Sequence, residues 1–267
     1  MKSPMETCSL HDKAQIEAFL RRNVYLHIYS IGDLDDFFWH NTVWYALKDR
    51  GDIQALVLLY TVPPQPTLHA MCEPHEPMAE LLRSILHLLP NRFHAHLSPG
   101  LTEVFAERYT LEYNEKHYKM ALTDKSRLTG VDCTQVIHLT ADDLDDMLAL
   151  YEEAYPGNWF DPRMLKTGQY FGIRKEGKLI SVAGVHVCSQ KYEVASLGNV
   201  VTHPAHTSSG YAKAASARLC QSLAEMVTHI GLNVAATNTA AMALYEKIGF
   251  EIISPYHECM ITTNEHE

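Results

Sequence analysis

The sequence lacks several features that would place the protein in a specialised class. No apolar run among its 267 residues reaches the ~18 residues that a membrane-spanning helix needs. The first residues, Met1–Cys8, lack the apolar core of a secretory signal peptide. No cluster of Lys and Arg is present, and the formal net charge is −10. These absences predict a cytoplasmic protein with neither a nucleic-acid nor a membrane partner.

Cysteine and histidine give no sign of disulfides or metal. The six cysteines include no CxxC pair and mostly stand in apolar segments, as buried thiols do in a reducing compartment. Among the 16 histidines, His94 and His96, with His87 nearby, come closest to a metal-binding pattern. Alternate residues of a strand share a face for many reasons, and no third ligand follows at helical i, i+4 spacing. We therefore expect no metal site.

The length and the polar segment 124–132 predict two domains, residues 1–127 and residues 128–267. Both halves show the same predicted order of helix, two hairpin strands, third strand, helix, strand, helix and strand. The repeat lies in this topology rather than in the amino-acid letters, and it predicts a mixed α/β fold. The main predicted helices are residues 11–22, 78–89, 101–109, 144–155, 213–230 and 239–247; the main predicted strands are residues 42–47, 53–60, 68–72, 93–97, 111–122, 134–139, 170–174, 179–188, 194–202, 232–236 and 251–261.

The two halves differ most where the third strand meets the following helix. Such a junction presents unpaired backbone N–H groups and the positive end of a helix dipole, which together suit a phosphate. The first junction, residues 71–77, has no glycine, two prolines without N–H groups and two acidic residues. The second junction, residues 203–212, contains Gly210 and no acidic residue. Only the second half is therefore expected to bind an anion.

Two motifs of the second half resemble the GNAT N-acetyltransferase superfamily. His203-Pro204 precedes Thr-Ser-Ser-Gly-Tyr-Ala at residues 207–212, which falls on the family's cofactor pattern Gln/Arg-x-x-Gly-x-Gly/Ala. Residues 238–250, Asn-Thr-Ala-Ala-Met-Ala-Leu-Tyr-Glu-Lys-Ile-Gly-Phe, match a second family feature. Residues 168–184 also look like the glycine N-acyltransferase-like subgroup. The resemblance implies two tandem GNAT-like domains, the first degenerate, with acetyl-CoA as the co-substrate of the second.

The resemblance also implies which residues bind the cofactor. The end of the third strand would separate from its neighbour, residues 232–236, and would bind the pantetheine arm as an added strand does, through Val200, Val201 and Thr202. The turn would hold the pyrophosphate through Thr207, Ser208, Ser209, Gly210, Tyr211 and Ala212. One departure is evident, because Thr207 replaces the usual Arg or Gln and Ser208 the usual first glycine. The hydroxyl groups of the turn, His206 or Lys213 could compensate.

The last helix carries the residues that the resemblance places nearest to the chemistry. Asn238, Ala241 and Tyr245 share one helical stripe because of their i, i+3, i+7 spacing. Asn238 would anchor the pantetheine, and Tyr245 would protonate the leaving thiolate. Without the surrounding motif, Tyr245 would be interpreted as a half-buried aromatic residue at the end of a helix.

The general base and the acceptor site stay open at this point. The candidates for the base are His186, His203, Glu193 and a chain of water molecules. Trp159 and Phe160 either line the acceptor pocket or belong to the core.

We expect an N-acyltransferase that transfers an acetyl group to a primary amine by direct attack. The amine would belong to a small molecule or to a protein. A non-catalytic protein that binds or senses acyl-CoA is the alternative, and the substitution at Thr207 permits it. In a third interpretation the first half mediates protein interaction or the formation of a homodimer.

Overall fold

The computed structural model describes residues 5–62, 65–73 and 75–264, which form two compact units. Unit 1 contains the described residues up to Lys119, residues 235–237 and residues 253–264; unit 2 contains residues 120–234 and 238–252. The boundary expected after residue 127 assigns the whole last strand to the second domain. Most of that strand packs in unit 1 instead, because it pairs with a strand there, from His257 opposite Leu97 to Thr262 opposite Arg92.

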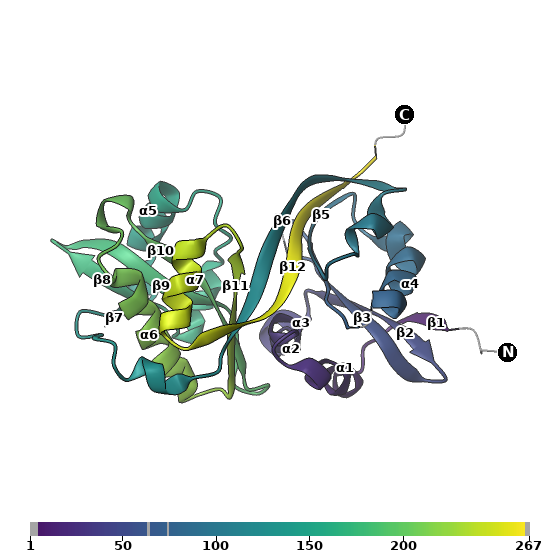
Figure 1. The fold of residues 1–267 in the computed structure, drawn as a ribbon, viewed down its shortest axis with the longest axis horizontal. Helices are drawn as coiled ribbons and strands as arrows, with labels where there is room; N and C mark the ends of the chain where they lie inside the picture. The colour runs from purple at the N-terminus through teal and green to yellow at the C-terminus, as the bar shows by residue number, and fades with distance from the viewer. Residues whose placement is uncertain (1–4, 63–64, 74, 265–267) are drawn as a thin grey trace. The chain divides into compact units, whose positions relative to one another are not determined.

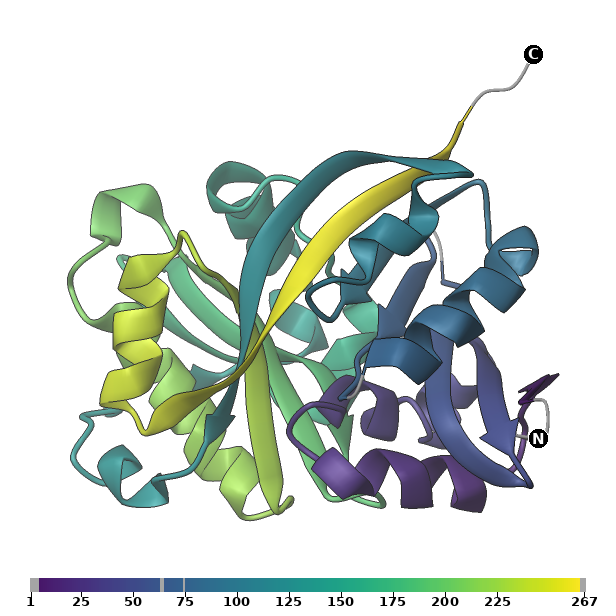
Figure 2. The same cartoon turned by 45° about the vertical axis from the view of Figure 1, so that its right-hand side comes forward.

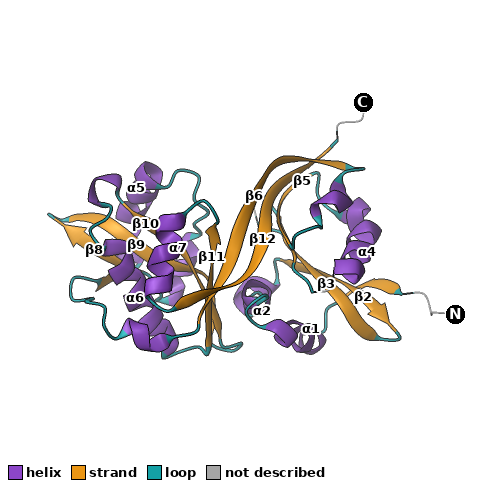
Figure 3. Cartoon of the chain, in the orientation of Figure 1, coloured by secondary structure: helices purple, strands orange, loops and turns teal. Residues whose placement is uncertain are grey.

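Unit 1 contains a mixed sheet with short helices (Figures 1 and 3). Its strand order is β1-β2-β3-β4-β5-β12-β6, in which only β4 and β5 form a parallel pair among the pairings described. The last strand, β12, runs beside β5 and β6 in both views (Figures 1 and 2). The elements are β1 (Glu6–Ser9), α1 (Lys13–Leu20), α2 (Ile28–Gly32), α3 (Asp36–Trp39), β2 (Thr42–Asp49), β3 (Asp52–Tyr60), β4 (Thr67–Ala70), α4 (His75–Ile85), β5 (Arg92–Leu97), β6 (Tyr109–Leu122) and β12 (Phe250–Thr263).

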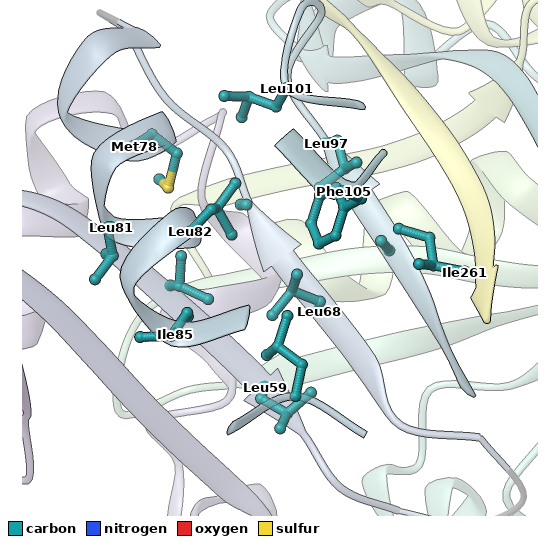
Figure 4. Packing of buried hydrophobic residues seen from close by; sticks show 14 of the residues in the cluster. Leu59, Leu68, Met78, Leu81, Leu82, Ile85, Leu97, Leu101, Phe105 and Ile261 are labelled. Carbon is teal, nitrogen blue, oxygen red and sulfur yellow. The ribbon is translucent and has the colours of Figure 1, made fainter. Parts of the chain in front are cut away.

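One face of this sheet forms the apolar core of unit 1. Helix α4 supplies Met78, Leu81, Leu82 and Ile85 to this core, at the spacing of a single helical face (Figure 4). Alternate residues of β5, such as Phe93 and Leu97, belong to the same core, because successive side chains of a strand face opposite sides. The last strand contributes Cys259 and Ile261, both fully buried. Burial of these apolar side chains is the main stabilising contribution to the unit.

Unit 2 has the strand order β11-β10-β9-β8-β7, with β10 and β11 parallel and the other pairs antiparallel. Helix α6 packs against β8, β9 and β10, and α5 packs against β9 and β10. A capping box at Thr140 and Asp143 precedes α5. Gly249 follows the end of α7 with φ +102°, and a Cβ there would lie 2.1 Å from the Asp124 carbonyl oxygen. The elements are β7 (Ile137–His138), α5 (Leu144–Ala154), β8 (Phe171–Lys175), β9 (Lys178–Ser189), β10 (Val194–Thr202), α6 (Tyr211–Ala224), β11 (His229–Ala235) and α7 (Thr239–Lys247).

Three predicted elements differ from the structure. The helix expected over residues 101–109 is wrong: a single 3₁₀ turn, Thr102–Phe105, already brings Leu101 and Phe105 into the core, and β6 starts at Tyr109. The strand expected over residues 134–139 shortens to the two residues that pair with β8. The helix expected over residues 213–230 ends at Ala224, because β11 starts at His229 and its residues 229–232 pair with β10. No helix in the described residues has the length and apolar character of a membrane span.

A polar cluster lies on the other face of the unit 1 sheet, opposite the apolar core. The Oε2 atom of Glu258 on β12 lies 3.5 Å from Nε2 of His96 and 3.6 Å from Nε2 of His117. The Tyr256 hydroxyl donates a hydrogen bond of 3.3 Å to the same oxygen. The buried Lys119 ammonium lies 5.3 Å from the ring centroid of Tyr256. In the described part of the chain, no group of three or more His, Cys, Asp or Glu residues is arranged to hold a metal ion.

The cluster controls the protonation of Glu258. Burial by itself would raise the pKa of this carboxyl group, but the hydrogen bond from His96 and the charges of His96 and His117 outweigh burial. The pKa falls from the usual 4.5 to about 2. The carboxylate therefore stabilises the folded state at every pH above 4.5, and its contribution is lost as the pH falls from 4.5 toward 2.

Glu258→Gln should reduce the dependence of protein stability on pH in the acid range. The amide does not titrate, so the free energy of unfolding should depend less on pH between 4.5 and 2 than in the parent protein. Urea unfolding measured across the acid range checks this, with the exposed Glu107→Gln as the matched control. An unchanged slope in Glu258→Gln would show that the cluster does not hold the carboxylate in its charged form.

Candidate active site at the β10–α6 junction

The parallel pairing of β10 with β11 stops before β10 ends. The two strands pair from Val194 opposite His229 to Leu197 opposite Leu232. Strand β10 then continues for five residues, 198–202, and none of these has a partner in the described part of β11. The expected separation of the two strands is therefore confirmed. On the side of β11 this strand end has no strand partner, so a ligand can lie beside it as an added strand does.

Two bulges distort the antiparallel pairing of β10 with β9 over the same stretch. His186 is an extra residue on β9, because Ser196 pairs with Val187 and the next residue, Leu197, pairs with Val185. Residues 199 and 200 of β10 then oppose only Ala183. Each strand has one extra residue, so the register is restored at Val201. Bulges re-aim side chains and amide groups without changing the rest of a sheet.

A pair of glycines in the sheet makes room for two aromatic rings. Gly184 and Gly198 are directly opposite each other on β9 and β10, so their absent side chains would point to the same face. A Cβ at Gly184 would lie 2.0 Å from the Tyr170 ring, and one at Gly198 would lie 2.0 Å from the His186 ring. The exposed Trp159 packs beside His186, with ring centroids 5.9 Å apart. The structure thus gathers aromatic side chains beside the unpaired end of β10.

The turn after β10 is held by His203. Its Nδ1 accepts a hydrogen bond of 3.1 Å from the Ala205 N–H, and its Nε2 lies 2.8 Å from Oε1 of Glu153. Since Nδ1 acts as an acceptor, the ring proton is on Nε2 and is donated to Glu153. Both ring nitrogens are therefore engaged in structural hydrogen bonds. This arrangement removes His203 from the general-base candidates.

The turn itself depends on left-handed backbone at two residues. Ser208 has φ +62° and Gly210 has φ +82°. The left-handed backbone at Ser208 is strained, because glycine adopts it readily and, among residues with a side chain, Asn and Asp tolerate it best. A Cβ added to Gly210 would meet nothing within 4 Å in the protein. Gly210 is therefore required for the course of the backbone rather than for packing within the chain.

The turn and the start of α6 present free backbone donors. Residues 207–210 are exposed, and no described residue accepts a hydrogen bond from the backbone N–H groups of residues 208–213. The hydroxyl groups of the turn do not cap α6, and those of Thr207 and Ser209 donate to carbonyl oxygens of the turn. Since α6 has 14 residues, its dipole adds positive potential at this end. The junction therefore fits a phosphate or pyrophosphate.

Helix α7 holds the three residues predicted to face the cofactor. The Asn238 side-chain oxygen accepts from the Ala241 N–H at 3.1 Å, which makes Asn238 the N-cap of the helix. The side-chain NH2 group of Asn238 is then left to bind a ligand. Tyr245 is buried, with 7% of its surface exposed, and lies near Cys220 and Tyr155. Burial raises the pKa of Tyr245 far above its usual value, so the phenol stays protonated at neutral pH.

The other candidates for the general base and the acceptor pocket lie at different places relative to the β10–α6 junction. Glu193 precedes the first residue of β10 and therefore lies at the opposite end of the strand from the turn. His186 lies at the bulge, against Gly198. Phe160 packs between Tyr151 and Tyr170, with ring centroids 5.1 Å and 5.7 Å away. Of the proposed bases, His186 lies beside Gly198, the first residue of β10 without a β11 partner, and His203 directly follows the end of the strand.

Unit 1 has the equivalent junction in a closed form. All four residues of β4 pair with β5, from Thr67 opposite His94 to Ala70 opposite Leu97. Beyond the strand ends, the Ser98 hydroxyl accepts a hydrogen bond of 3.0 Å from the Cys72 N–H. It also donates one of 3.3 Å to the Cys72 carbonyl oxygen. The strands are thus tied together where β10 and β11 part. Of the two prolines at this junction, Pro74 lies outside the described residues.

A comparison with protein families identifies the domain that contains the β10–α6 junction. Residues 136–250 match the model of the acetyltransferase (GNAT) family. This part of the chain is a GNAT domain. No curated protein matches the chain by sequence.

Solved structures extend the GNAT fold to nearly the whole chain. A Drosophila protein superposes with a TM-score of 0.70 at 13% identity, covering 97% of this chain and 98% of its own. A GCN5-related N-acetyltransferase from Sphaerobacter thermophilus gives 0.60 at 13% identity, with 97% and 95% covered. A tandem GNAT protein from the clavulanic acid biosynthesis pathway gives 0.58 at 11% identity, with 99% and 100% covered. The chain therefore has the mixed α/β fold of a tandem GNAT protein.

Sequence reasoning placed the GNAT junction but missed the residues around the bulge. Tyr151, Tyr170 and Asn199 were not singled out, although hydrogen bonds join Asn199 to both tyrosines. Gly184 and Gly198 gave a usable signal, because glycine inside a strand pattern often marks a bulge or a close approach. The partners of a bulge are set by tertiary contacts and cannot be deduced from local spacing.

Ser208→Gly should stabilise the protein. It removes a side chain from left-handed backbone, and we expect a gain of about 1 kcal/mol in the free energy of unfolding. Ser209→Gly is the matched control, because Ser209 is equally exposed but does not have a positive φ. Urea unfolding of both variants checks the difference. Equal destabilisation by the two glycines would contradict the left-handed turn at Ser208.

Proposed function

We propose that unit 2 binds acetyl-CoA at the β10–α6 junction and transfers its acetyl group to a primary amine. One observation carries the proposal: within one GNAT unit, β10 loses its β11 partner after Leu197, and the following turn presents the free N–H groups of residues 208–213. An elongated ligand with an amide-containing arm and a pyrophosphate matches both features. Acetyl-CoA would supply an acyl thioester, which is activated for attack by an amine.

The binding contacts would come mainly from the backbone. The N–H and C=O groups at Val200, Val201 and Thr202 would pair with the pantetheine arm, and residues 207–212 would surround the pyrophosphate. An N–H group of the β10 bulge would donate to the thioester oxygen as its negative charge grows. Because backbone groups make most of these contacts, Thr207 can replace the usual Arg or Gln with a loss of affinity rather than of the site.

The transfer requires two proton movements. The amine nitrogen attacks the thioester carbon, the new C–N bond forms, and the C–S bond breaks with its electrons on sulfur. Tyr245 would donate its phenolic proton to that sulfur, and the resulting phenolate regains a proton from water. The proton released by the amine would pass to water, or to His186, which lies beside the bulge. Trp159 and Phe160 would form part of the acceptor side.

A non-catalytic acyl-CoA-binding protein is the second candidate function. One observation favours it: the Thr207 hydroxyl donates to the Pro204 carbonyl oxygen at 3.2 Å, so the turn gains no charged donor at the position where the family has Arg or Gln. Such a protein would bind acetyl-CoA without acetylating any amine in a panel of amino acids, polyamines and peptides. Product detection by mass spectrometry separates the two functions.

Acetyl-CoA should bind the protein, and a negative charge in the turn should oppose it. Ser209→Glu should weaken binding about tenfold or more, because a carboxylate would lie beside the phosphate groups. Gln190→Glu is the matched control, since it adds the same charge at an exposed residue before the start of β10. Isothermal titration calorimetry measures the affinities. Absence of binding to both CoA and acetyl-CoA in the parent protein would refute the proposed function.

Tyr245→Phe should lower kcat about a hundredfold while leaving the Kd for acetyl-CoA within about twofold. The loss would arise because the thiolate leaves without the proton that Tyr245 donates. Tyr192→Phe is the control, because Tyr192 is also a buried tyrosine of unit 2 but stands before β10. Loss of acetyl-CoA binding in Tyr245→Phe would identify a structural residue, and an unchanged kcat would exclude the acid role.

A further inference from the structure

Asn199 interrupts β10 with left-handed backbone. Its φ is +55°, and only 3% of its surface is exposed. Asparagine tolerates this conformation better than other residues with a side chain, but the surroundings must still hold it there. The residue is one of the two that oppose Ala183 in the bulge. The conformation of Asn199 therefore sets the direction of the amide groups that follow it along the unpaired end of β10.

Two buried tyrosines hold Asn199 from different sides. The Tyr151 hydroxyl on α5 donates to the Asn199 backbone carbonyl at 3.1 Å. The Asn199 Nδ2 donates to the Tyr170 hydroxyl oxygen at 3.0 Å, and that hydroxyl donates to the Val185 carbonyl at 2.9 Å. Because the single Tyr170 proton goes to Val185, Tyr170 must accept from Asn199, and this fixes the orientation of the Asn199 amide.

The tyrosine rings are themselves fixed by packing. Phe160 lies between them, with centroid distances of 5.1 Å to Tyr151 and 5.7 Å to Tyr170. The Tyr170 ring rests against Gly184, where any Cβ would overlap it. Both tyrosines are at most 4% exposed. Rigid neighbours of this kind keep hydrogen-bonded groups within the narrow geometry that a binding site needs.

We propose that Tyr151 and Tyr170 are positioning residues that hold Asn199 in its left-handed conformation and so aim the bulge amides of β10 at the acyl thioester. The inference deepens the proposed function and rests on it. The tyrosines act through Asn199 and touch neither ligand. Their role differs from simple packing, because each is joined to Asn199 by its hydroxyl group, the part of the side chain that phenylalanine lacks.

The test uses Tyr151→Phe, Tyr170→Phe and the double variant of the full-length protein. Isothermal titration gives the Kd for acetyl-CoA, and hydrogen exchange of the ligand-free protein follows the peptide over residues 197–203. Each single variant should weaken binding and speed exchange of that peptide by about five- to tenfold, as expected for one buried hydrogen bond. The double variant should show less than the product of the two effects, because both hydroxyl groups hold one residue.

Tyr109→Phe is the matched control. The Tyr109 hydroxyl also donates from a buried ring to a backbone carbonyl, that of Leu86 at 3.0 Å, but in unit 1. Tyr109→Phe should lower the melting temperature by about as much as Tyr151→Phe or Tyr170→Phe does, and it should leave the Kd for acetyl-CoA unchanged. Asn199→Gly is a second route to the same test, since glycine accepts the left-handed backbone without the anchor to Tyr170. It should reproduce the Tyr170→Phe changes.

The outcomes separate the positioning role from the proposed function. If the parent protein binds acetyl-CoA and the tyrosine variants lose only thermal stability, with Kd and exchange unchanged, the positioning role is refuted. If the parent protein does not bind acetyl-CoA, the proposed function is refuted first. Hydrogen exchange over residues 197–203 then still reports whether the hydroxyl groups hold the bulge.

Discussion

The structure of unit 2 depends on one constraint: residues 198–202 of β10 have no partner in the described part of β11, and the backbone N–H groups of residues 208–213 have no described acceptor, yet both lie at one junction. Backbone polar groups are costly to leave unpaired away from water, so a fold that keeps such a junction needs either solvent or a ligand there. The paired bulges at His186 and Asn199 turn the strand without disturbing the pairing on either side. Positions 184 and 198 beside these bulges require glycine, because the rings of Tyr170 and His186 occupy the space that side chains there would fill.

Unit 1 shows that this topology does not by itself create the site. Its parallel strands stay paired to their ends, and Ser98 ties Cys72 across the place where β10 and β11 part. The polar cluster of unit 1 stabilises the unit itself. Glu258 contacts His96, His117 and Tyr256 on the sheet face away from the apolar core. The same fold thus supports an open junction in one unit and a closed one in the other, and function must be argued from the site rather than from the fold.

The sequence predicted those features that depend on local pattern. Alternation and helical spacing located most strands and helices, and the glycine and proline contrast between the two junctions indicated which one is open. Features that depend on distant partners were not predictable. The apolar residues Leu101, Phe105 and Tyr109 have helical spacing, but tertiary packing uses them in a 3₁₀ turn and a strand. The contacts of Asn199 with Tyr151 and Tyr170 span 48 and 29 residues, and no local signal joins them.

The absence of an arginine or glutamine at position 207 has a definite physical meaning in this arrangement. A guanidinium group would add a charge-assisted contact, whereas backbone N–H groups and the α6 dipole act through partial charges that are fixed by the fold. Fixed donors require no ordering of a flexible side chain when a ligand binds, so part of the lost attraction is offset by a smaller entropic cost. Binding through the backbone depends on the shape of the turn, and hence on Ser208 and Gly210, more than on any single charged residue.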